Sequence, residues 1–246
     1  MPNLDQQLYD IVMRHLSRLD DYTYKKSLEV DKLQKIYAQD PLFSVFGLDS
    51  PDYIVTSRGG GLVTSVHRKI GDAMQETVQV AMEHQLELSA EQLSYRADIA
   101  SGDQVESRSI DCFIALGDLR AAHRHRIHTI ARRLTQTVAP GSSFSINGLG
   151  FEVRHCYQSA DSKRVQADEA MARHLYLSNI VPVMLVFCGL SNRSVMDRYR
   201  HVWVLTEGMA SFDLVSEITA YDFYGFFTRH ADVFRVQVAK ALSQMT

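Results

Sequence analysis

Two acidic residues and an arginine have the types and spacing needed to hold a divalent metal ion. Asp111 interrupts the otherwise apolar segment SRSIDCFIAL, and Glu152 and Arg154 are two residues apart in GFEVRHCYQ. Side chains alternate along a strand, so Glu152 and Arg154 are expected on one face. A buried carboxylate is costly unless it is paired or bound to metal. The alternative is a structural aspartate at a strand end and a surface Glu–Arg pair.

Two such carboxylates on neighbouring strands would suit Mg²⁺, which needs one or two carboxylates together with water and phosphate oxygens. The bound metal could activate a water toward a phosphodiester and neutralise charge on the phosphate. Arg154 could hold a phosphate oxygen or the attacking water. Lys163 begins a predicted helix nearby, where it could reach the site or DNA, or only decorate the helix N-terminus.

The segment LRAAHRHRIHTIARR (119–133) has no acidic residue and is the most biased part of the sequence. As a helix it would present a cationic surface that fits phosphate backbones and guanine edges. Its three histidines lack the H-E-x-x-H spacing of a zinc site, so we do not expect them to bind metal. The alternative is a solvated helix whose charges pair with acidic residues elsewhere. The arginines are Arg120, Arg124, Arg126, Arg132 and Arg133.

A second candidate for anion binding is SRGGG (57–61), within an expected loop over residues 41–62. A helix is expected to begin near Thr64 or Ser65, and glycines before a helix N-terminus favour close approach of a phosphate. The pattern matches neither nucleotide-binding motif, so no nucleotide cofactor is expected. The alternative is a plain flexible loop. Further candidate DNA contacts are Arg58, His67, Arg68, Lys69 and, after the second carboxylate, Arg164.

The hydrophobic pattern indicates the elements that must position these residues. Two helices are expected in the first forty residues, and a third reaches about Leu88. The helices and strands expected after it indicate a mixed sheet with helices on both faces, an α/β (α+β mixed) fold. Strands are expected at 93–99, 105–116, 148–158, 180–188 and 201–205, and helices at 119–138, 161–178, 207–217 and 221–244.

Composition limits the class of protein. With 246 residues, 46% of them hydrophobic and 22% charged, the chain can bury a full core without disulfides or structural metal. The net charge of −3 excludes global basic character, so any affinity for nucleic acid must come from local clusters. Cys112, Cys156 and Cys188 lack C-x-x-C spacing and are expected to be buried free thiols. Without a signal peptide or apolar span, a cytoplasmic protein with no membrane contact is expected.

The order of several blocks resembles type II restriction endonucleases of the ApaLI/XbaI group, in the PD-(D/E)XK nuclease superfamily. The blocks are SRGGGLVTSVHRKIGD, SIDCFIAL, FEVRHCYQSADSKR, PVMLVFC and EGMASFDLVSEITAYDF, which together cover roughly residues 57–227. The resemblance implies a restriction-endonuclease-like central mixed sheet flanked by helices, preceded by an N-terminal helical region. A single nuclease domain is expected, with 1–56 as the helical region and 57–246 as the catalytic core and C-terminal helices.

By position, Asp111 and Glu152 look like the two metal-binding acids of that motif. Arg154 falls where the motif usually has lysine, and because arginine does not deprotonate it could stabilise charge but not act as a base. Lys163 could substitute for the missing lysine. Glu76, on the helix before the sheet, looks like an accessory acid near the metal.

The resemblance implies a Mg²⁺-dependent endonuclease that cuts a short palindrome in double-stranded DNA as a homodimer and leaves 5′-phosphate ends. The resemblance makes 5′-GTGCAC-3′ the first site to test. A different class stays open: a non-catalytic DNA-binding relative in which Arg154 marks a degenerate active site. A hydrolase of small phosphoesters is a third option, but it would leave the cationic segment unexplained.

Overall fold

The computed structural model describes residues 3–19, 30–38, 50–101, 104–138, 141, 145–157 and 162–243. Contacts divide the chain into two compact units. The first contains Met1–Leu8 and Met74–Thr228, and the second contains Tyr9–Ala73 and Arg229–Thr246. Every strand in the described part of the chain lies in the first unit, as do both candidate metal-binding acids. The expected division at residue 57 stays a prediction.

The predicted N-terminal helices are present. Helix α1 spans Leu4–Ser17 and α2 spans Val30–Tyr37. The apolar stripe of α1 is buried as its period predicts, with Leu8, Ile11 and Val12 at most 7% exposed. In the second unit, Tyr9 of α1 contacts the ring of Phe234 in helix α10 (Ala231–Ser243).

The expected loop before the third helix is wrong where the structure describes it. Helix α4 runs without interruption over Pro51–Leu86, and its 36 residues include the whole SRGGG segment. Proline is favoured in the first turn of a helix because its missing N–H has no intrahelical partner there. The Ile54 N–H already donates to the Ser50 carbonyl, and the Thr64 hydroxyl donates to the Gly60 carbonyl. The start expected near Thr64 or Ser65 is therefore also wrong.

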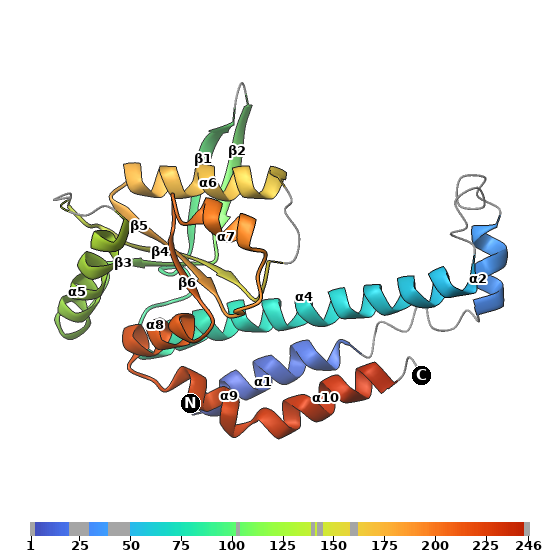
Figure 1. Cartoon of the computed structure of the whole chain (residues 1–246). Coiled ribbons are helices and arrows are strands. Elements are labelled where there is room, and N and C mark those ends of the chain that lie inside the picture. The colour runs from blue at the N-terminus through green and yellow to red at the C-terminus, as the bar shows by residue number, and fades with distance from the viewer. Residues whose placement is uncertain are drawn as a thin grey trace. The chain divides into compact units, whose positions relative to one another are not determined.

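The strands form an antiparallel ribbon and a mixed sheet (Figure 1). The ribbon contains β1 (Tyr95–Ser101) and β2 (Gln104–Ile110). The sheet has the order β3-β4-β5-β6, with β3 (Cys112–Ala115) antiparallel to β4 (Gly148–Arg154). Strands β5 (Ile180–Val186) and β6 (Val204–Glu207) continue it in parallel. A mixed α/β class is thus confirmed, and the strand expected over 105–116 is broken in two at Asp111.

Helices cover the sheet. Helix α5 (Ala121–Val138) contacts β4, β5 and β6, and it also contacts α8 (Met209–Thr219). Helix α6 (Ser162–Leu177) packs on β5, where Met171, Ala172 and Leu175 join one buried cluster with Met184. Figure 1 shows α6 on the opposite side of the four strands from α5 and α8. The side chains of Glu152 and Arg154 alternate with those of Phe151 and Val153, so the two site residues share a face of β4.

Two helical details were not predicted. Helix α7 (Arg193–Tyr199) begins after the N-cap Asn192, whose side chain accepts from the Ser194 N–H. The helix expected over 221–244 is two helices, α9 (Phe223–Arg229) and α10.

Trp203, which is fully buried, joins the cluster that contains Tyr199. Among the described residues, no helix has the length and apolar character required to cross a membrane.

Candidate active site

Asp111 occupies the break between β2 and β3 and takes over part of the strand pairing. Its backbone N–H donates to the Phe151 carbonyl at 3.0 Å, as a strand residue would. Its carboxylate oxygen Oδ2 then accepts the Val153 N–H at 2.7 Å. The side chain therefore satisfies a backbone donor of β4, and this contact fixes the carboxylate beside that strand.

Arg154 joins the two predicted metal-binding acids. Its Nη1 lies 3.2 Å from Asp111 Oδ2 and also donates to the Val153 carbonyl at 2.9 Å. Its Nη2 forms an ion pair with Glu152 Oε1, and Glu152 is only 6% exposed. The carboxylates of Asp111 and Glu152 thus meet at one guanidinium, which agrees with the predicted convergence of the two strands.

Burial dominates the electrostatics of this cluster. Burial raises the pKa of Asp111 above its ordinary value, although Arg154 and the Val153 N–H act to lower it. Asp168 raises it further, and Arg164 lowers it. Burial also opposes the charge of Arg154, but the neighbouring Tyr157, Asp111 and Asp168 raise its pKa on balance. Arg154 is therefore a fixed cation at neutral pH.

Three residues that the sequence did not single out form a hydrogen-bonded cluster, and two of them, Tyr157 and Asp168, raise the pKa of Arg154. Asp168 of α6 accepts hydrogen bonds through Oδ2 from the hydroxyls of Tyr157 at 3.1 Å and Tyr199 at 2.6 Å. A signal for Asp168 existed, because it shares a helical stripe with the buried Val165 and Ala172. An acid on a buried stripe indicates a partnered polar group.

The donors fit a hard divalent cation. Asp111 and Glu152 offer carboxylate oxygens, the ligand type that Mg²⁺ prefers. The raised pKa of Asp111 reflects a burial cost that Arg154 does not fully offset, and a bound cation would reduce that cost. Among the described residues, no group of three or more His, Cys, Asp or Glu side chains is arranged to hold a metal. A metal here would therefore rely on two carboxylates, with water and substrate completing its coordination.

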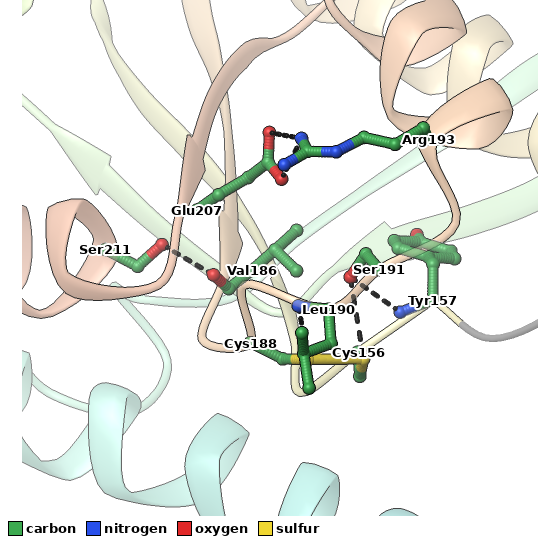
Figure 2. Close-up of a disulfide and its surroundings, with 9 residues drawn as sticks. All are labelled: Cys156, Tyr157, Val186, Cys188, Leu190, Ser191, Arg193, Glu207 and Ser211. Atoms are coloured by element: carbon green, nitrogen blue, oxygen red, sulfur yellow. Dashed lines mark hydrogen bonds and ion pairs between the residues drawn. A yellow bond between two sulfur atoms is a disulfide. The ribbon is translucent and has the colours of Figure 1, made fainter.

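The cysteines differ from the expectation. Cys112 is buried and free, as predicted, and burial raises the pKa of its thiol. Cys156 and Cys188 instead form a disulfide (Figure 2). Arg154 of β4 lies opposite Val186 of β5 in the parallel pairing. Cys156 and Cys188 each come two residues after these paired positions. Strand register thus brings the two sulfurs together, which the odd cysteine count and the absence of C-x-x-C could not indicate.

The disulfide is linked to the site by Ser191. Its hydroxyl donates to Cys156 Sγ at 3.6 Å and accepts the Tyr157 N–H at 3.1 Å, as Figure 2 shows. The Asn192 N–H donates to the Tyr157 carbonyl at 2.7 Å. The backbone of Tyr157 is therefore held on both sides by the segment that follows β5.

Most arginines of the basic helix have partners inside the protein. Arg120 pairs with Glu87, and Arg133 pairs with Glu217. Arg124 donates to the carbonyls of Leu116, Gly117 and Leu119, and Arg126 donates to the Ile218 carbonyl. These contacts match the alternative of a solvated helix paired elsewhere, while Arg132 is exposed. DNA contact by this helix stays a prediction.

Three of the other predicted site residues, Lys163, Arg164 and Glu76, lie in the first unit. Lys163 and Arg164 are exposed at the start of α6, and Arg164 lies near enough to Asp111 to lower its pKa. Glu76 is half-buried in α4, and its role as an accessory acid stays a prediction.

The prediction that residues 57–61 form a phosphate site at a helix N-terminus is wrong, because these residues lie inside α4. Gly59–Gly61 lie inside α4, where their N–H groups are directed along the helix rather than into a loop. Within that helix, His67 is half-buried, Arg68 is exposed and Lys69 pairs with Asp72 at 3.3 Å. Arg58 also lies in α4, and its side chain is outside the described part of the chain. Binding of DNA by these four residues stays a prediction.

Comparisons with protein-family models, curated proteins and solved structures give no match to this chain.

Proposed function

We propose that the protein is a Mg²⁺-dependent endonuclease of the restriction type with a restriction-endonuclease-like fold. The observation that carries the proposal is that the carboxylates of Asp111, at the break before β3, and Glu152, in the adjacent strand β4, both pair with the guanidinium of Arg154. This is the donor pair that the sequence resemblance implies. The ApaLI/XbaI-like assignment, the palindromic target and the homodimer belong to the same proposal.

In this proposal the two carboxylates would hold Mg²⁺, which would supply a water of lowered pKa and stabilise charge on the phosphate. Asp111 is held for this role by the Val153 N–H, and Glu152 is shielded from solvent by its position in β4. Arg154 is a permanent cation, so it stabilises negative charge on a phosphate and does not remove a proton. The arginines of α5, with Arg164, bind the phosphate backbone and make affinity dependent on salt.

The test is digestion of a supercoiled plasmid that contains one GTGCAC site, with Mg²⁺ or with EDTA. We expect discrete products only with Mg²⁺, and mapping their ends identifies the recognised sequence. Glu152→Gln should bind DNA and fail to cut it. The matched control is Glu169→Gln on α6, since Glu169 pairs with Arg198 and lies outside the carboxylate pair. Full activity of Glu152→Gln would refute the site, and no cutting by the wild type would refute the function.

A second candidate is the non-catalytic DNA-binding relative. Arg154 already pairs with both acids, so the site is partly neutralised without metal. This candidate predicts DNA binding that is equal with Mg²⁺ and with EDTA, and no cutting under either condition. Measuring binding and cleavage in the same samples separates the two candidates.

A further inference from the structure

The Cys156–Cys188 disulfide lies where β4 and β5 end, close to the proposed site. Arg154 and Val186 form the last pair of the parallel ladder, and each cysteine comes two residues later. The Phe187 N–H donates to the Arg154 carbonyl at 3.0 Å, so the covalent bond comes directly after this backbone contact. The disulfide therefore ties the chain just beyond Arg154 to the chain just beyond β5.

The two bonded cysteines are more accessible than the third. Cys156 and Cys188 are half-buried, and Gly189 next to Cys188 is exposed. Cys112 is 1% exposed, and its thiol donates to the sulfur of Met82 at 3.3 Å. Thiol–disulfide exchange requires that a thiolate reach one of the bonded sulfurs. These exposures favour exchange at the disulfide over reaction at Cys112.

Each sulfur of the disulfide accepts a hydrogen bond. The Ser191 hydroxyl donates to Cys156 Sγ at 3.6 Å, and the Leu190 N–H donates to Cys188 Sγ at 3.2 Å (Figure 2). A hydrogen bond to sulfur stabilises a thiolate, and a more stable thiolate leaves faster when the bond is attacked. Whichever sulfur leaves during exchange therefore has a donor beside it.

Reduction would leave hydrogen bonds to hold this end of β4. The Tyr157 N–H donates to the Ser191 hydroxyl at 3.1 Å, and the Asn192 N–H donates to the Tyr157 carbonyl at 2.7 Å. Segments held by few contacts open locally more often than the core of a sheet. Arg154 lies three residues before Tyr157 and pairs with both carboxylates of the proposed site. Local opening would therefore loosen the guanidinium between them.

We propose that Cys156 and Cys188 form a reversible redox site that takes a dithiol as its co-substrate, and that their oxidation state sets the order of the β4 end beside Arg154. One thiolate of the dithiol attacks a sulfur of the disulfide, and the other sulfur leaves as a thiolate and takes up a proton. The second thiol of the dithiol then breaks the mixed disulfide. The dithiol thereby loses two electrons and two protons and becomes a disulfide, and the two cysteines gain them as two thiols. An effect on DNA cleavage rests on the proposed function, whereas the exchange and the change in order do not.

The first experiment follows exchange in the folded protein. Wild type is equilibrated with reduced and oxidised dithiothreitol at graded ratios, alkylated with iodoacetamide and analysed by mass spectrometry. We expect Cys156 and Cys188 to be alkylated together, to a fraction that follows the ratio and falls when oxidised dithiothreitol is restored. Cys112 should be alkylated only after denaturation, because it is buried.

The second experiment measures amide hydrogen exchange in oxidised and reduced wild type. After reduction we expect exchange over residues 154–157 and 187–192 to be about tenfold faster, and exchange in the β1–β2 ribbon to stay within about twofold. Cys156→Ser/Cys188→Ser should exchange like reduced wild type under both conditions. The matched control is Cys112→Ala, which should keep the full response to dithiothreitol. In a DNA cleavage assay with Mg²⁺, reduction of wild type should lower kcat about tenfold.

The results separate the redox site from the proposed function. Reversible alkylation with faster exchange confined to the two strand ends supports the proposal. It does so even if wild type cuts no DNA, a result that overturns only the proposed function. Alkylation of Cys156 and Cys188 only after denaturation overturns the redox site. Unchanged exchange over residues 154–157 after reduction, or faster exchange throughout the first unit, overturns the link between oxidation state and the end of β4.

Discussion

Arg154 balances the charge of two carboxylates that are largely shielded from water. Removing one partner of a buried ion pair costs about 3–5 kcal/mol, since the remaining charge loses both solvent and counter-ion. We therefore expect Arg154→Gln to lose about that much unfolding free energy in EDTA, measured by urea titration with circular dichroism.

Mg²⁺ should restore part of the stability of Arg154→Gln, because a ligand that binds only the folded state stabilises it. Wild type measured with and without Mg²⁺ is the control. If Mg²⁺ has no effect on Arg154→Gln, then Asp111 and Glu152 do not form a metal site, and the binding-only candidate gains support.

The ionisation of Asp111 should itself cost stability. Burial raises its folded-state pKa above the unfolded value, so the protonated form stabilises the fold. That contribution is complete below the ordinary aspartate pKa and is lost as pH rises through the raised folded value. In EDTA, Asp111→Asn should therefore melt above wild type at neutral pH and approach it on acidification. A lower midpoint at neutral pH would mean that pairing with Arg154 outweighs burial.

At the scale of residues, alternation along β4 was enough to place Glu152 and Arg154 together, because the period of a strand is fixed by its geometry. Asp168 and the two tyrosines were missed since their meeting depends on how α6 and α7 lie against the end of β4. Local spacing carries no information on such tertiary contacts.

Helix α4 shows how a run of glycines can mislead a prediction of elements. Three consecutive glycines favour a loop by their intrinsic propensity, yet they lie inside the helix. A side chain at Gly60 would meet no atom within 4 Å. We expect Gly60→Ala to raise unfolding free energy by about 0.5–1 kcal/mol, measured by urea denaturation.

Gly148→Ala provides the contrasting control for Gly60→Ala. There an added carbon would clash with the Ile114 carbonyl oxygen across the β3–β4 pair, and a loss of about 1–3 kcal/mol is expected. If Gly60→Ala were instead destabilising, this would indicate that residues 57–61 are not helical, and it would support the phosphate-binding loop predicted from the sequence.

The Cys156–Cys188 disulfide should contribute to the stability of the sheet. It closes a loop with a sequence separation of 32, for which the chain-entropy model gives about 3–4 kcal/mol. Dithiothreitol should lower the unfolding free energy of wild type by that amount and leave Cys156→Ser/Cys188→Ser unchanged. Titration of thiols in denatured protein provides an independent check, since three thiols before reduction would exclude the bond.

For the whole molecule, the net charge of −3 makes local clusters decisive for DNA affinity. If α5 binds phosphates, Arg132→Gln should reduce the slope of log affinity against log salt by about one unit. Glu217→Gln should strengthen binding, because it releases Arg133 from its ion pair. A filter-binding assay in EDTA measures DNA affinity for both variants without cleavage. Unchanged slopes for both variants would indicate that α5 faces solvent only.

The class of fold could be predicted because, in most segments, the hydrophobic periodicity of the segment itself indicates a helix or a strand. The strands at 95–101, 148–154 and 180–186 lie within or close to their expected ranges. The break at Asp111, the helix at Arg193–Tyr199 and the disulfide could not be predicted, since each depends on a partner distant in sequence. The division into contact units likewise depends on which segments meet.

The burial of Trp203 gives the protein a spectroscopic probe of its own. It is the single tryptophan of the chain, it is fully buried, and its backbone N–H donates to the carbonyl of Tyr199. Its emission should shift to longer wavelength when the unit that holds Asp111 and Glu152 unfolds, and the other unit contains no tryptophan to obscure that signal.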